Sequence, residues 1–63
     1  MGNSVSEMIN AQISSKLVRI AWLEEQFKHA DCYAKQERYL KEATKKKLEI
    51  EELRGILREF NGT

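Results

Sequence analysis

The stretch KHADCYAK, residues 28–35, lies at the middle of a 63-residue chain and decides its fold. The segments on both sides are rich in Ala, Leu, Glu, Lys, Gln and Arg, which are good helix formers, and neither shows the alternation typical of a strand. The stretch itself contains neither Gly nor Pro, so its local chemistry permits a continuous helix. The pattern of apolar residues on either side must therefore show whether the chain turns back here.

Each half of the chain carries its own apolar stripe at helical spacing. The first stripe is Val5, Ile9, Ile13, Leu17, Ile20, Leu23, Phe27 and Ala30, and the second is Tyr39, Ala43, Ile50, Leu53, Leu57 and Phe60, flanked by Leu40 and Ile56. In one straight helix the stripe would rotate by roughly 120° between Ile20 and Ile50, and by roughly 200° at the 3.5-residue repeat of a coiled coil. One continuous helix would thus present its two halves to different sides. The mismatch favours an antiparallel hairpin in which each stripe faces the other, with one long helix in a coiled-coil assembly as the alternative.

Local signals place the ends of the two helices. Lys28 and His29 suit the end of a first helix, and Asp31 is a competent N-cap for a second. Ser4 and Glu7 have the spacing of a capping box, and Asn61-Gly62 is a natural stop. We therefore expect a single all-α domain over 1–63, with a flexible N-terminus at 1–5 and a tail at 61–63. Its helices are expected over about 6–29 and 32–60, with the turn near 29–34.

A chain this short buries only about 60% of the surface that it exposes when unfolded, so a lone monomer is marginal. The single cysteine, Cys32, cannot form an internal disulfide and fits a reducing, cytoplasmic or otherwise intracellular compartment. Self-association into a homodimeric four-helix bundle is the expected remedy. The residues expected to form the core and the self-association surface are Ile9, Ile13, Leu17, Ile20, Leu23, Phe27, Tyr39, Ile50, Leu53, Leu57 and Phe60.

Val18 and Trp22 lie one turn apart, on the side of the first helix opposite its stripe. One interpretation is that this helix is buried on two sides within a bundle. The other is a docking patch for a different protein, because Trp is enriched among interface anchors. Both interpretations predict that Trp22 is covered when the protein functions.

The basic residues of the second half suggest an alternative function, dimeric RNA or DNA binding. They are Lys35, Arg38, Lys41, Lys45, Lys46 and Lys47. Helical geometry spreads the three consecutive lysines around the helix, acidic residues interleave with them, and the net charge of the chain is only +1. A solvated, salt-bridged face is the simpler explanation. Lys16 and Lys46 fall within the apolar stripes, where each must extend to water or to a nearby carboxylate, or line a small anion pocket. The nearby carboxylates are Glu42, one turn from Lys46, and Glu24 or Glu49.

The remaining motifs are short. MGNSVS matches the N-myristoylation pattern at Gly2, which gives a second alternative, a lipid-anchored peripheral membrane protein. His29, Asp31 and Cys32 are metal-ligand types, but His29 and Cys32 supply only two ligands on one helical face and zinc needs four. We expect no metal, no cofactor, no catalytic residue and no enzymatic activity. The leading hypothesis is a small non-enzymatic interaction module, a regulator, adaptor or assembly factor that binds itself and another protein.

Overall fold

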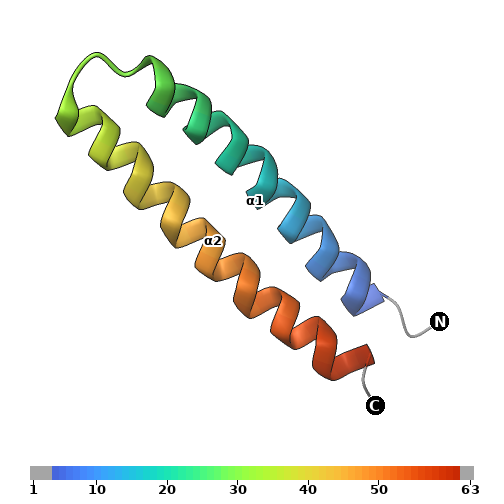
Figure 1. The fold of residues 1–63 in the computed structure, drawn as a ribbon. Helices are drawn as coiled ribbons and strands as arrows, with labels where there is room; N and C mark the ends of the chain where they lie inside the picture. The colour runs from blue at the N-terminus through green and yellow to red at the C-terminus, as the bar shows by residue number, and fades with distance from the viewer. Residues whose placement is uncertain (1–3, 62–63) are drawn as a thin grey trace.

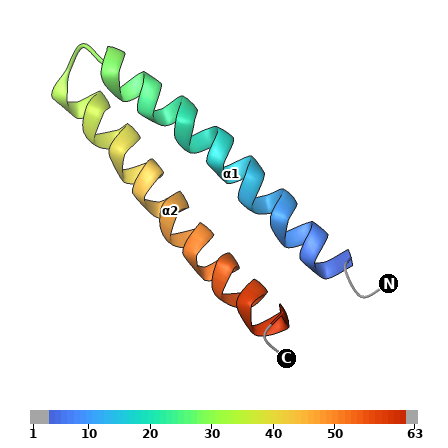
Figure 2. The same ribbon diagram turned by 45° about the vertical axis from the view of Figure 1, so that its right-hand side comes forward.

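The computed structural model of the chain describes residues 4–61, which form two helices, α1 (Ser4–His29) and α2 (Tyr33–Asn61). The helices run antiparallel and lie side by side along their length, as both views show (Figures 1 and 2). The molecule is accordingly long and thin, with extents of 49 × 15 × 10 Å. The predicted all-α hairpin is confirmed, and the alternative of one long helix is wrong.

The turn occupies residues 30–32 and needs no left-handed residue, because no residue from 4 to 61 has a positive φ. At its start the Ala30 amide donates to the Phe27 carbonyl over 3.4 Å, which tightens the last turn of α1. At its end the Gln36 amide donates to the Cys32 carbonyl over 3.2 Å. Cys32 is therefore the N-cap of α2, since its carbonyl accepts the first bond of the helix.

The predicted cap at Asp31 is thus one residue too early. The Asp31 carboxylate lies 3.5 Å from the Lys35 ammonium, where it supports the first turn of α2 through charge rather than through a capping bond.

The outer ends of the helices also differ from the prediction. α1 begins at Ser4, so Ser4 lies inside the first turn instead of preceding it, and residues 4 and 5 are helical rather than flexible. α2 continues to Asn61, one residue into the predicted tail. Residues 1–3 and 62–63 lie outside the described part of the chain.

The core is a single layer of aliphatic side chains between the helices. The buried residues are Ile9, Ile13, Ile20, Leu23, Ala43 and Ile50. Leu53 and Leu57 pack against them and are half-buried, as is Tyr39. Burying one such aliphatic side chain contributes about 1.5–3 kcal/mol, so this thin layer supplies most of the energy that holds the hairpin closed.

Three residues expected in the core are exposed within the single chain. They are Leu17, Phe27 and Phe60, with 46%, 37% and 54% of their surfaces accessible. Leu17 is rotated about 80° from Ile9 on an ideal helix, and α2 alone does not reach around that far. Phe27 and Phe60 belong to the last turns of their helices, where one chain has few neighbours to cover them.

Candidate interaction surfaces

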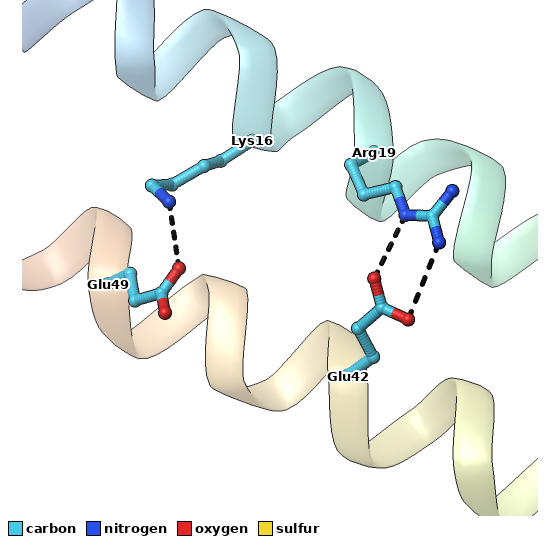
Figure 3. Close-up of polar contacts among 4 residues, drawn as sticks. All are labelled: Lys16, Arg19, Glu42 and Glu49. Carbon is cyan, nitrogen blue, oxygen red and sulfur yellow. Dashed lines mark hydrogen bonds and ion pairs between the residues drawn. The ribbon is translucent and has the colours of Figure 1, made fainter.

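One side of the hairpin, which we call the ion-pair flank, is closed by two salt bridges between the helices (Figure 3). Lys16 Nζ donates to Glu49 Oε1 over 2.8 Å. Arg19 binds both oxygens of Glu42, with Nε 2.9 Å from Oε2 and Nη2 3.5 Å from Oε1. Glu49 is thus the partner of Lys16 among the three carboxylates that the sequence offered, and the contribution of Arg19 was not predicted.

These contacts lower the pKa values of both carboxyl groups. The hydrogen bond from Arg19 lowers the pKa of Glu42 below its usual 4.5, and the positive charges of Arg19, Lys46 and Lys45 act in the same direction. The hydrogen bond from Lys16 lowers the pKa of Glu49 in the same way. Both carboxyl groups are therefore held in their charged form in the folded hairpin.

Lys16 and Lys46 were predicted, as one alternative, to line an anion pocket. A shallow depression of about 300 Å³ does lie beside Lys16, Arg19 and Lys46, but the Glu42 carboxylate also lines it. Because Glu42 and Glu49 already neutralise the nearest cations, the depression offers little attraction to a further anion.

Trp22 takes part in the contact between the helices. The Arg19 guanidinium carbon lies 4.2 Å from the centre of the Trp22 ring, a cation–π arrangement. The ring meets Tyr39 of α2 edge-on, with centroids 6.2 Å apart and planes at 90°. Trp22 nevertheless keeps 45% of its surface accessible, and Val18, one turn earlier, keeps 71%. Together they leave an apolar patch open beside a positively charged side chain.

The opposite side of the hairpin holds an apolar groove, with a volume of about 480 Å³. Glu24 and Lys47 close it with a weaker ion pair of 3.5 Å, and Glu24 is rotated about 140° around α1 from Arg19. The side chains that line the groove are Leu23, Phe27, Tyr39, Leu40 and Ala43, with Glu24, Lys28 and Lys47 at its edges.

A second hollow continues from this groove onto the outer face of α2, and Leu40 lines both. It measures about 520 Å³, and its apolar lining is Tyr33, Leu40 and Leu48, with Thr44 between them. These three apolar residues have 78%, 54% and 62% of their surfaces accessible, respectively. We call Tyr33, Leu40, Thr44, Leu48 and the following Gly55 the α2 seam. The seven- and eight-residue spacings of this seam are visible in the sequence, but the seam was not predicted.

The six basic residues proposed for nucleic-acid contact do not form one free patch. Lys35, Lys41 and Lys47 lie 3.5, 3.8 and 3.5 Å from Asp31, Glu37 and Glu24, respectively. Lys46 is half-buried near Glu42 and Glu49. Within residues 4–61, Arg38 and Lys45 are the two members of the set that neither form an ion pair nor lie half-buried.

The turn residues show ordinary local contacts. The His29 ring lies 3.0 Å from the Glu25 carboxylate, and Cys32 is an exposed free thiol. Across the described residues no group of three or more His, Cys, Asp or Glu side chains is arranged to hold a metal ion. Neither α1 nor α2, as far as the structure describes them, has a stretch apolar and long enough to span a bilayer. Gly2, the candidate lipidation site, lies outside the described residues.

Comparison of the chain with family models, with curated proteins and with solved structures found no match.

Proposed function

We propose that the chain is a small non-enzymatic interaction protein whose working form is a self-associated hairpin, a dimer of the four-helix-bundle type. The observation that carries the proposal is the large amount of apolar surface outside the core. In the described part of the chain, eleven large hydrophobic side chains are exposed, whereas the core contains only six buried residues. A second hairpin placed over the apolar groove and the α2 seam would remove several of these side chains from water.

The small size of the chain also favours self-association. A two-helix chain of this length has one thin core layer, and small proteins of this kind usually need a partner, a metal or disulfides for stability. A single free cysteine provides no internal disulfide, and a dimer would bury additional apolar area of each chain without a disulfide or a metal.

The direct test is the mass of the wild-type chain in solution, measured by sedimentation equilibrium across low and high micromolar concentrations. We expect twice the mass of one chain, with dissociation on dilution and a rising melting temperature as the concentration increases. A mass equal to one chain throughout this range, together with a melting temperature independent of concentration, would contradict the proposal.

Binding of a different protein is the second part of the proposed function, and Val18 and Trp22 support it. A ring stacked with an arginine at the edge of an exposed apolar patch has the composition of an interface anchor. Trp22→Ala is a poor test, because it also removes contacts to Arg19 and Tyr39. Val18→Glu is sharper, since 71% of Val18 is accessible: we expect unchanged helicity and unchanged self-association, with loss of binding to any partner that uses this patch.

The basic residues of α2 support nucleic-acid binding less well, because half of that set already faces carboxylates within the chain. A gel shift with generic RNA at low salt distinguishes the two functions. RNA binding that is detected at low salt and falls steeply as the salt concentration is raised would favour the nucleic-acid alternative over the interaction module.

A further inference from the structure

We infer that the α2 seam is covered by the α2 seam of a second copy, with the two α2 helices antiparallel and Leu48 near the twofold axis. This inference rests on the proposed self-association and specifies the surface and the orientation that it uses.

The α2 seam lies on the side of α2 that faces away from α1. Leu48 is rotated about 160° from the buried Ile50 on an ideal helix, so α1 of the same chain cannot cover it. Leu40, Thr44 and Leu48 recur every four residues, and Tyr33 and Gly55 extend the row by seven residues at each end. This spacing places all five on one side of α2 at the intervals that antiparallel helices use when they pack together.

Positive and negative charges are distributed unevenly along α2. Residues 33–48 contain six basic and two acidic side chains, a net charge of +4, whereas residues 49–61 contain four acidic and two basic ones, a net charge of −2. In a twofold antiparallel pair, each half of one helix lies against the opposite half of the other. The basic half of each copy therefore meets the acidic half of its neighbour, twice. A parallel pair would place like charges together and is disfavoured.

Charged residues of both signs also line one edge of the α2 seam. Lys41, Lys45, Glu52 and Glu59 lie within about 40° of one another around α2. With Leu48 near the axis, Lys45 of one copy falls opposite position 51 of the second copy, next to its Glu52, and Lys41 falls between Glu52 and Glu59 of the second copy. Among the described residues, Lys45, Glu52 and Glu59 form no ion pair within their own chain. Exposed pairs of this kind contribute little energy individually, so their role is to fix the orientation while the seam supplies the affinity.

Gly55 fits the same arrangement. Leu40 and Gly55 lie eight residues before and seven residues after Leu48, so a twofold axis near Leu48 brings Leu40 of one copy over Gly55 of the other. Apart from Gly55, its two neighbours and the adjacent backbone of its own helix, no atom lies within 4 Å of the position that a Cβ at Gly55 would occupy, which leaves room for that leucine.

The test is a pair of charge reversals, Lys41→Glu/Lys45→Glu in one variant and Glu52→Lys/Glu59→Lys in another. All four residues are exposed, so circular dichroism should show unchanged helix content in both. Each variant alone places like charges across the interface, and we expect its dimer dissociation constant to rise about tenfold or more. An equimolar mixture of the two variants restores opposite charges, and we expect it to form a mixed dimer at least as tight as the wild-type dimer.

The matched control is Glu7→Lys/Glu25→Lys, which makes the same change in net charge as the second variant, on the face of α1 that points away from α2. It should dimerise as the wild type does. A wild-type chain that is monomeric overturns the proposed function itself. A wild-type dimer whose two charge variants associate normally, or are not restored on mixing, overturns only the α2–α2 arrangement.

A second measurement is independent of charge. Leu48→Cys in a Cys32→Ser background should form a disulfide between two copies under mild oxidation, because residues near a twofold axis approach their own counterparts. Val18→Cys in the same background is the control and should crosslink much more slowly. Equal crosslinking rates for the two variants would contradict the inference.

Discussion

Leu23→Ala tests whether the single aliphatic layer holds the hairpin together. Leu23 has only 1% of its surface accessible, the least of the core residues. The substitution removes three carbon atoms, worth about 0.8 kcal/mol each in transfer free energy, and leaves a cavity at the base of the apolar groove. The expected loss in the free energy of unfolding is therefore about 2.5–4 kcal/mol. Because a domain of this length has a total stability of roughly 3–9 kcal/mol, the variant should be largely or partly unfolded at 37 °C.

The assay is urea denaturation followed by circular dichroism at several protein concentrations, with Leu48→Ala as the matched control. Leu48 is 62% exposed, so the same chemical change removes little packing within one chain. The effect of Leu48→Ala should appear chiefly as a weaker dependence of the urea midpoint on protein concentration, because the α2 seam is proposed to act between copies. If Leu23→Ala lowered the free energy of unfolding by less than about 1 kcal/mol, this description of the core would be refuted, because truncating a buried leucine in a well-packed layer costs more than that.

Three further outcomes are expected. Because the folded-state pKa values of Glu42 and Glu49 lie below 4.5, the stability that these groups supply is complete above that pH and is lost as pH falls through the lower folded values. In acid titrations followed by helicity, Glu42→Gln/Glu49→Gln should therefore flatten the decline below pH 4.5, and an unchanged decline would contradict this. Gly55→Ala introduces no contact within the chain and should raise the stability of the hairpin by about 1 kcal/mol when measured at low concentration, where dimers dissociate. Cys32→Ser replaces a poor N-cap with a good one and should raise the melting temperature, by an amount equivalent to about 0.5–1 kcal/mol; a lower melting temperature would mean that Cys32 does not cap α2.

The hairpin could be predicted because its signal is spread over many residues. The phase difference between the stripes around Ile20 and Ile50 does not depend on any single assignment, and both residues are buried as expected. The N-cap of α2, in contrast, depends on a single residue, and its prediction at Asp31 was wrong. Asp31 has the stronger intrinsic preference, but the path of the turn gives the N-cap position to Cys32.

Contacts between the helices were harder to foresee, because they depend on register and on rotation about each helix axis. The sequence indicated that Lys16 needs a carboxylate, because it lies within the stripe, but it did not decide between Glu49 and the other acids nearby. Trp22, in contrast, was placed opposite the stripe, yet its ring is long enough to reach the edge of Tyr39, and Arg19 lies over its face. A prediction made only from the angular positions of residues around each helix does not account for the length of a side chain such as that of Trp22.

The antiparallel arrangement also determines how the molecule responds to force. The outer ends of α1 and α2 lie at the same end of the rod, and the turn lies at the other (Figure 1). Tension applied between those two ends would pull the helices apart sideways, so it would load one layer of contacts at a time instead of all together. After the apolar contacts of Ile9 and Ile13 at the open end, Lys16–Glu49 would separate, then Arg19–Glu42, and the Trp22–Tyr39 contact nearer the turn would follow. A single hairpin therefore resists little force when its two outer ends are pulled apart. A second copy bound along α2 would not hold α1 against α2, so it would stiffen the hairpin against bending but not against this separation of its helices.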